Sequence, residues 1–182
     1  MELIASVYIA TSLDGFIARE DGSLDWLDAA SATVPDGEDC GYAAFMNSID
    51  ALIMGRNTYE KVLSFGQWPY EKKPVIVLSS RALEIPDSLS NMVEHSFESP
   101  NKLYERLSKM GLKRIYIDGG ITIQRFLDAG LIDDITITKI PIIIAKGKPL
   151  FDGLHRDIAL KHIATKSYEF GFTQSTYQVL KN

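Results

Sequence analysis

A buried strand that ends in glycine and passes directly into a helix is the strongest constraint in this sequence. Residues 51–54 are apolar throughout, Gly55 follows, and residues 56–64 carry Tyr59 and Val62 at helical spacing. Such a junction turns backbone N–H groups and the positive end of a helix toward an anion. It predicts an α/β chain in which strands and helices alternate, although an ordinary tight turn fits the same residues.

Two further strand ends carry residues suited to phosphate. The strand predicted over residues 114–117 ends in Asp118-Gly119-Gly120, and paired glycines allow a close approach of the backbone to a pyrophosphate. The strand over residues 75–78 ends in Ser79-Ser80-Arg81. Hydroxyls beside an arginine suit a ribose 2′-phosphate, whereas an NAD site typically places an acidic residue near the ribose. The three strand ends together predict an anion-binding edge of an open α/β sheet.

The rest of the chain predicts the other elements of such a sheet. Strand-like runs cover residues 3–12, 16–18 and 134–144, and helical patterns cover residues 42–48, 100–110 and 121–129. The stretches 158–167 and 173–180 predict an antiparallel hairpin through residues 169–171. The alternating middle and strand-rich ends predict a three-layer α/β fold with a mostly parallel central sheet and an antiparallel C-terminal hairpin. A length of 182 residues predicts a single domain over residues 1–182.

Composition excludes several classes of protein. Hydrophobic residues make up 46% and charged residues 24%, as in a folded soluble chain, and the net charge of −5 argues against nucleic-acid binding. No apolar run approaches the length of a membrane span, and the N-terminus lacks signal-peptide features, so we expect a cytoplasmic protein. Cys40 is the only cysteine and the three histidines lack metal-ligand spacing, so we expect no disulfide and no metal site.

Four segments resemble the dihydrofolate reductase-like superfamily, in particular the branch shared with the pyrimidine reductase domain of the bifunctional deaminase-reductase of riboflavin biosynthesis. Residues 53–60 resemble a segment with a Gly-Arg-x-Thr core, residues 77–81 its Leu-Ser-Ser segment, and residues 118–120 its glycine-rich pyrophosphate turn. Residues 12–18, followed by Gly22 and Trp26-Leu27, are closer to the riboflavin-type domain. The chain lacks GxGxxG and a P-loop lysine motif, which disfavours a Rossmann dehydrogenase and a nucleotide triphosphatase.

The resemblance implies NADPH as the hydride donor and assigns a role to each segment. It places the cofactor phosphates at Gly55, Arg56 and Thr58, and the 2′-phosphate at Ser79, Ser80 and Arg81. It places the pyrophosphate at Gly119, Gly120, Ile121 and Thr122, the nicotinamide at Ala10 and Ile17, and further cofactor contacts at Leu78 and Asp118. Residues 18–26 correspond to a mobile lid over the nicotinamide, and closing a lid excludes water from the reacting atoms.

The substrate half of the site is less well defined. Dihydrofolate reductases use one acidic residue to bind the pterin and deliver a proton, and counting back from Gly55 places Asp39 there, with Glu38 and Asp36 as alternatives. Such an acid must be buried with a raised pKa to hold a proton near neutral pH, whereas a solvated acidic loop fits the same residues.

Three further residues are candidates for substrate binding. Asp14 either points a carboxylate at the substrate or only shapes the Asp-Gly turn. Trp26 and Tyr42 either stack on a planar heterocycle or pack in the core. At residues 59–62 the chain has Tyr-Glu-Lys-Val in place of the acidic Asp-Pro stretch of the riboflavin-type domain, and the deaminase half is missing. Both departures count against a dedicated riboflavin-pathway role.

These observations predict an NADPH-dependent oxidoreductase that reduces a C=N or C=O bond of a pterin-like or pyrimidine-like small molecule. One alternative is the reduction of 5-amino-6-(5-phosphoribosylamino)uracil, and another is a catalytically silent NADPH-binding module, since fold does not guarantee function. By analogy with the riboflavin-type relatives, a homodimer through the β-rich C-terminal region is expected.

Overall fold

The computed structural model describes residues 2–181 and contains ten strands, five α-helices and one short 3₁₀ helix. The strands are β1 (Ile4–Ser12), β2 (Phe16–Ala18), β3 (Ala51–Gly55), β4 (Val75–Leu78), β5 (Val93–Ser96), β6 (Arg114–Asp118), β7 (Asp134–Ile140), β8 (Lys148–Pro149), β9 (Leu160–Ser167) and β10 (Thr173–Val179). The helices are α1 (Asp25–Ser31), α2 (Tyr42–Asn47), α3 (Arg56–Leu63), η1 (Asp87–Leu89), α4 (Pro100–Lys109) and α5 (Gly120–Asp128).

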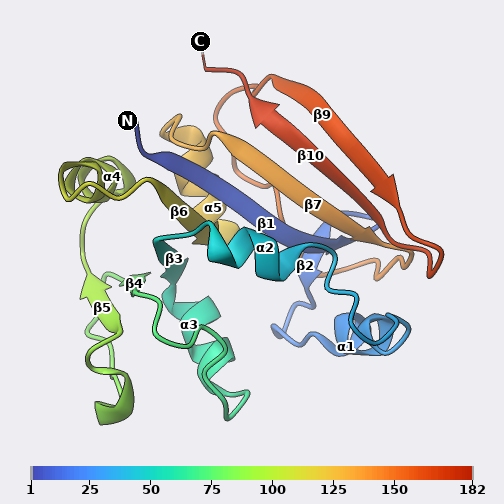
Figure 1. Ribbon diagram of the computed structural model, residues 1–182, viewed down its shortest axis with the longest axis horizontal. Helices are drawn as coiled ribbons and strands as arrows, with labels where there is room; N and C mark the ends of the chain where they lie inside the picture. The colour runs from blue at the N-terminus through green and yellow to red at the C-terminus, as the bar shows by residue number, and fades with distance from the viewer. Residues whose placement is uncertain (1, 182) are drawn as a thin grey trace.

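Eight of the strands form one sheet in the order β5-β4-β3-β6-β1-β7-β10-β9, and β2 pairs separately with β8 (Figure 1). The six strands from β5 to β7 are parallel, whereas β10 runs antiparallel to both β7 and β9. The predicted fold class is therefore confirmed, including the C-terminal hairpin.

The parallel strands bury side chains on both faces of the sheet because helices cover both faces. The core on one face includes Leu103 and Leu107 of α4 with Ile123 and Phe126 of α5. The core on the opposite face includes residues of α2 and α3, namely Phe45, Tyr59 and Val62. A third cluster beneath α1 holds Trp26, Ile140, Ile144, Tyr168 and Phe172.

The connections of β3 and β6 leave the sheet in opposite directions. The chain passes from β3 through α3 to β4 on one side, and from β6 through α5 to β7 on the other. Right-handed crossovers that run in opposite directions place their helices on opposite faces of the sheet, as the two cores show. The carboxyl ends of β3 and β6 are adjacent, so they form the topological switch point where open α/β sheets bind ligands.

The sequence analysis did not predict the strand β5, because three of its four residues, Glu94, His95 and Ser96, are polar. An edge strand of this kind carries no continuous apolar run. It also placed a β-rich run within residues 134–144, centred on 135–138, and β7 ends at Ile140 immediately before Pro141. Proline cannot donate to the strand ladder, which accounts for this end.

The outer hairpin strand β9 is an unpaired sheet edge whose eight residues are all exposed. Its exposed side chains include Leu160 and Ile163. The homodimer expected through this region stays a prediction. Among residues 2–181, the structure contains no helix long and apolar enough to cross a membrane.

Candidate functional site

The junctions at β3 and β6 interlock through two glycine–threonine pairs. Gly55 precedes α3 and Thr58 is the third residue of that helix; Gly119 precedes α5 and Thr122 is its third residue. A Cβ atom on Gly55 would lie 3.0 Å from the Thr122 hydroxyl, and a Cβ atom on Gly119 would overlap the Thr58 hydroxyl. Each threonine therefore packs against the glycine of the other junction. The packing holds two helix N-termini side by side at the switch point.

The glycine turn after β6 also contacts the short strand β2. Gly119 has a φ of +88°, which an L-residue rarely adopts, and a Cβ on Gly120 would lie 3.0 Å from Cδ1 of Ile17. The same Cβ would lie 3.3 Å from the carbonyl oxygen of Pro149 in β8. Ile17 and both junctions are thus brought together, as the resemblance implied. Ala10 instead packs against the cluster beneath α1, and Ile121 is 60% exposed.

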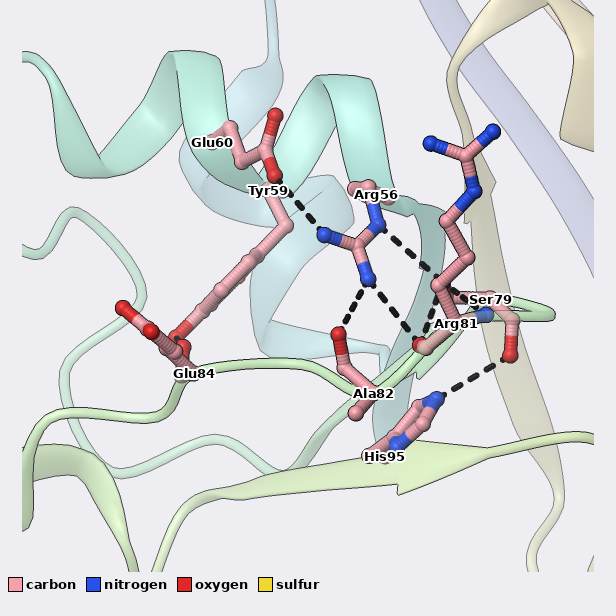
Figure 2. Close-up of polar contacts among 8 residues, drawn as sticks. All are labelled: Arg56, Tyr59, Glu60, Ser79, Arg81, Ala82, Glu84 and His95. Atoms are coloured by element: carbon pink, nitrogen blue, oxygen red, sulfur yellow. Dashed lines mark hydrogen bonds and ion pairs between the residues drawn. The ribbon is translucent and has the colours of Figure 1, made fainter.

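Arg56 uses most of its hydrogen-bond donors within the chain, and the phosphate role that the resemblance implied stays a prediction. Its Nε donates to Oγ of Ser79 at 3.1 Å, Nη1 pairs with Glu60 at 3.2 Å, and Nη2 donates to the carbonyl oxygens of Arg81 and Ala82 (Figure 2). These contacts use four of the five donors of a guanidinium. Arg56 therefore ties the start of α3 to the loop that follows β4.

Within that loop, Ser79 shapes the backbone and Arg81 faces outward. The Ser79 hydroxyl donates to the carbonyl oxygen of Arg81 at 2.9 Å and accepts from its N–H at 3.1 Å. The Arg81 guanidinium makes no hydrogen bond or ion pair with residues 2–181, and Figure 2 shows it directed away from Arg56. Ser80 is exposed beside it. Arg81 and Ser80 are the residues of this loop whose side chains an anion can reach.

Asp118 is the last residue of β6, and its side chain holds a proton more readily than the other carboxylates of this region. Burial raises the pKa of Asp118 from 3.8 to about 6, although the Gly119 N–H, 2.8 Å from Oδ1, opposes the shift. Tyr42, Tyr70 and Tyr116 interact with the same carboxylate. Desolvation, followed by the charge of Asp118, raises the pKa of Tyr42 to about 12. The sequence analysis placed Asp118 only with the cofactor and missed this second property.

Asp39 lacks the environment that the proposed acid requires. Its carboxylate is exposed and accepts from the N–H groups of Ala43 and Gly41, each at 2.8 Å, at the start of α2. These backbone bonds lower its pKa, the bond from Ala43 most strongly. Glu38 accepts from the N–H of Cys40 at 2.7 Å, and Asp36 is exposed. The three acidic residues therefore belong to a surface loop, in which Asp39 and Glu38 accept hydrogen bonds from the backbone.

Of the three substrate candidates, Tyr42 is the one whose pKa is raised by burial and by the charge of Asp118. The Asp14 carboxylate accepts from the Ser12 hydroxyl at 2.6 Å and the N–H of Ala145 at 2.8 Å, which lowers its pKa and ties the turn to a second loop. Trp26 is 2% exposed within the cluster beneath α1, where it packs as a core residue. Tyr42 is 37% exposed, with its ring centroid 5.9 Å from that of Tyr8.

Gln174 of β10 holds this side of the site together, and the sequence analysis did not identify it. Its Nε2 lies 2.9 Å from the Tyr8 hydroxyl, 2.9 Å from the Thr138 hydroxyl and 3.0 Å from the Cys40 carbonyl oxygen. The Tyr8 hydroxyl donates to the same carbonyl. The network fastens the loop before α2 to the sheet, and so fixes where Tyr42 begins that helix.

Comparison with known proteins places this architecture in a family. Residues 6–172 match the RibD C-terminal domain. The chain belongs to the RibD C-terminal domain family. It is 38% identical to the Bacillus subtilis protein YwjB over 92% of this chain and 94% of that one. It is also 26% identical to dihydrofolate reductase HdrB of Haloferax volcanii, over 69% of this chain and 62% of that protein.

Solved structures agree with this assignment. The crystal structure of "Putative riboflavin biosynthesis protein" from Shewanella sp. PV-4 has a TM-score of 0.91 and 40% identity, covering 98% of this chain and 99% of that one. The Thermotoga maritima diaminohydroxyphosphoribosylaminopyrimidine deaminase/5-amino-6-(5-phosphoribosylamino)uracil reductase shares the fold, with a TM-score of 0.72 and 14% identity over 57% of its length. The resemblance to the riboflavin-type branch of the dihydrofolate reductase-like superfamily is thereby confirmed.

The interlocked junctions of this RibD-type domain predict an unequal response to two matched glycine substitutions. Gly119 and Gly111 have φ values of +88° and +85°, but a Cβ on Gly111 meets nothing within 4 Å. Gly111→Ala should cost roughly 1 kcal/mol of unfolding free energy from backbone strain alone. Gly119→Ala should cost clearly more, since Thr58 must also move. Urea unfolding measures both, and equal losses would contradict the interlock.

The environment of Asp118 predicts a pH-dependent gain in stability on substitution. Because its pKa is raised from 3.8 to about 6 on folding, the stability that its protonated form provides is lost as the pH rises through about 6. Asp118→Asn should therefore stabilise the protein relative to wild type by about 2 kcal/mol more at about pH 7.5 than at about pH 4. Urea unfolding at both pH values tests this, and a difference that does not change with pH would refute the raised pKa.

Proposed function

We propose that this protein is an NADPH-dependent reductase that transfers a hydride to a C=N or C=O bond of a pterin-like or pyrimidine-like small molecule. The observation that carries the proposal is the arrangement at the switch point. Two helix N-termini meet there, packed together through their glycines and threonines, directly beside a carboxyl group with a pKa of about 6. Helix N-termini favour anions, and a carboxyl of this pKa can supply a proton near neutral pH.

The residues at the switch point fit a dinucleotide. A Cβ atom at Gly55, Gly119 or Gly120 would collide with Thr122, Thr58 or Ile17, so only glycine lets the two helix starts pack this closely. Backbone N–H groups at helix starts suit a pyrophosphate. Arg81 and Ser80, in the loop after β4, the strand next to β3, offer the charge and hydroxyl that suit a 2′-phosphate. Arg56 and Ser79 position that loop. NADPH, when bound, supplies the hydride.

Reduction of a C=N or C=O bond also consumes a proton, and Asp118 is the residue proposed to provide it. Its Oδ1 accepts from the Gly119 N–H, so the proton belongs on Oδ2. With a pKa of about 6, roughly a tenth of the molecules carry that proton at neutral pH. Tyr42 and Tyr70, whose pKa values are raised by burial and by the charge of Asp118, stay uncharged near neutral pH.

The substrate class rests on the relatives. The Shewanella protein carries a name from riboflavin biosynthesis, and the Haloferax protein is named a dihydrofolate reductase. The ring of Tyr42, which is 37% exposed and whose pKa is raised by burial and by the charge of Asp118, suits a planar heterocycle with a nitrogen or oxygen to protonate. The test is loss of NADPH absorbance with dihydrofolate, dihydropterins and 5-amino-6-(5-phosphoribosylamino)uracil. Turnover with one of them supports the proposal and identifies its branch. Tight NADPH binding with no turnover would favour a silent binding module, and no NADPH binding would refute the proposal.

Asparagine substitutions at the two candidate acids should give opposite results. Asp118→Asn should lower kcat roughly 10²- to 10⁴-fold, since it removes the positioned proton donor, whereas Asp39→Asn should leave kcat near the wild-type value. The kcat of the wild type should fall as the pH rises through about 6, because the protonated form of Asp118 is lost, and that of Asp118→Asn should not. A large loss in Asp39→Asn with little change in Asp118→Asn would reverse the assignment.

Substitutions of Arg81 and Arg56 should separate recognition of the 2′-phosphate from positioning of the loop after β4. Arg81→Ala should weaken NADPH binding about ten- to a hundredfold, the value of a charge-assisted contact, and leave NADH binding unchanged. Arg56→Lys should weaken both cofactors and lower the melting temperature, since a lysine cannot reproduce the contacts to Ser79 and the two carbonyls. Calorimetric titration with each dinucleotide measures both. Unchanged discrimination between NADPH and NADH in Arg81→Ala would exclude Arg81 as the 2′-phosphate ligand.

A further inference from the structure

An exposed aromatic ring stands at the carboxyl end of β5, beside the loop that carries Arg81. Phe97 is 70% exposed, the largest exposed fraction among the large hydrophobic residues of the described chain. It directly follows Ser96, which pairs with Leu78 at the end of β4, and the N–H of Ser79 donates to the Ser96 carbonyl at 3.1 Å. Neighbouring strands are about 4.8 Å apart, so Phe97 leaves the sheet next to the 79–82 loop.

The ring of Phe97 is held by a second aromatic side chain. The ring centroids of His95 and Phe97 are 4.2 Å apart with their planes at 54°. His95 Nε2 is in turn 3.0 Å from the carbonyl oxygen of Ser79, a contact drawn in Figure 2. His95 therefore connects Phe97 to the loop and fixes the ring relative to it.

Isolated exposed hydrophobic residues are common on protein surfaces and need no function. Phe97 differs because it lies at the carboxyl edge of the sheet and is linked through His95 to Ser79. Where β4 and β5 end, Phe97 lies next to the loop that carries Arg81 and Ser80, and the outward side chains of these two residues suit a 2′-phosphate. In an adenosine 2′-phosphate, the base and the phosphate are attached to adjacent carbons of one ribose. A flat apolar surface beside a phosphate site therefore suits the base.

We propose that Phe97 is the stacking surface for the adenine ring of the cofactor, with His95 as the residue that positions it. This inference rests on the proposed function, because it assumes that a 2′-phosphorylated dinucleotide occupies the switch point. It adds a specificity determinant on β5, a strand for which the sequence analysis predicted neither structure nor function. Stacking of a base on an aromatic side chain is independent of the nicotinamide end of the molecule.

Two fragments of the cofactor test the proposal on the whole protein by calorimetric titration. Adenosine 2′,5′-bisphosphate carries the base and the 2′-phosphate, and reduced nicotinamide mononucleotide carries neither. Phe97→Ala should weaken binding of the bisphosphate about tenfold to a hundredfold and leave binding of the mononucleotide unchanged. Phe97→Trp should retain the wild-type affinity. Phe65→Ala, at a phenylalanine that is 54% exposed on the loop after α3, is the matched control and should bind both fragments normally.

The outcomes separate this inference from the proposed function. If wild type binds the bisphosphate and Phe97→Ala binds it equally well, the stacking role is refuted while the reductase proposal stands. If wild type binds neither fragment nor NADPH, the proposed function itself fails. Phe97→Ala should keep the wild-type melting temperature, because the removed ring is mostly in solvent. Equal weakening of both fragments would indicate a general structural effect and would also overturn the proposal.

Discussion

The site depends on the reciprocal packing of two glycines and two threonines where β3 and β6 end. Each junction has the spacing Gly-x-x-Thr, and each threonine fills the space that the missing Cβ of the other glycine leaves. The helices that follow lie on opposite faces of the sheet, so this contact is what brings their N-termini to a common point. Ile17 then packs over the second glycine turn and Asp118 lies immediately before it. A side chain at Gly55 or Gly119 would disturb this arrangement from within.

The chemistry proposed for the site carries a cost in stability. A carboxyl with a pKa of about 6 is held in an environment that disfavours its charged form, so the native state loses stability at the pH where the proton is useful. The surrounding structure offsets this cost with ordered contacts. Gln174 reaches from β10 to Tyr8, Thr138 and the loop before α2, while Arg56 braces the loop after β4. We expect such remote contacts to preorganise the proposed substrate and cofactor halves of the site.

Much of the fold, but less of the site, could be predicted from the sequence. Apolar runs such as residues 51–54 and 114–117 predicted the core strands because parallel strands are buried on both faces. Strand β5 was missed because an edge strand tolerates Glu94 and His95, and Phe97 was missed with it. Asp39 was predicted as the acid, and Asp118 was assigned only to the cofactor, because counting along the chain does not report burial. The period of two along β6, however, places Asp118 on the same face as the buried Tyr116. The role of Gln174 depends on a partner 134 residues away, for which no local pattern exists.

Arg56 shows why a motif match and a structural role can differ. The motif predicted a phosphate ligand, yet the side chain is occupied by the carbonyls of the neighbouring loop, and Arg81 is left to face solvent. The central claim is that the switch point between β3 and β6 holds the dinucleotide with Asp118 facing the reacting end. A crystal structure of the protein soaked with NADPH tests it most directly. The account predicts the pyrophosphate against Gly55 and Gly119, the nicotinamide beside Ile17, and an open space next to the Asp118 carboxyl. A cofactor bound elsewhere on the molecule, or one that leaves Asp118 far from the nicotinamide, would contradict it.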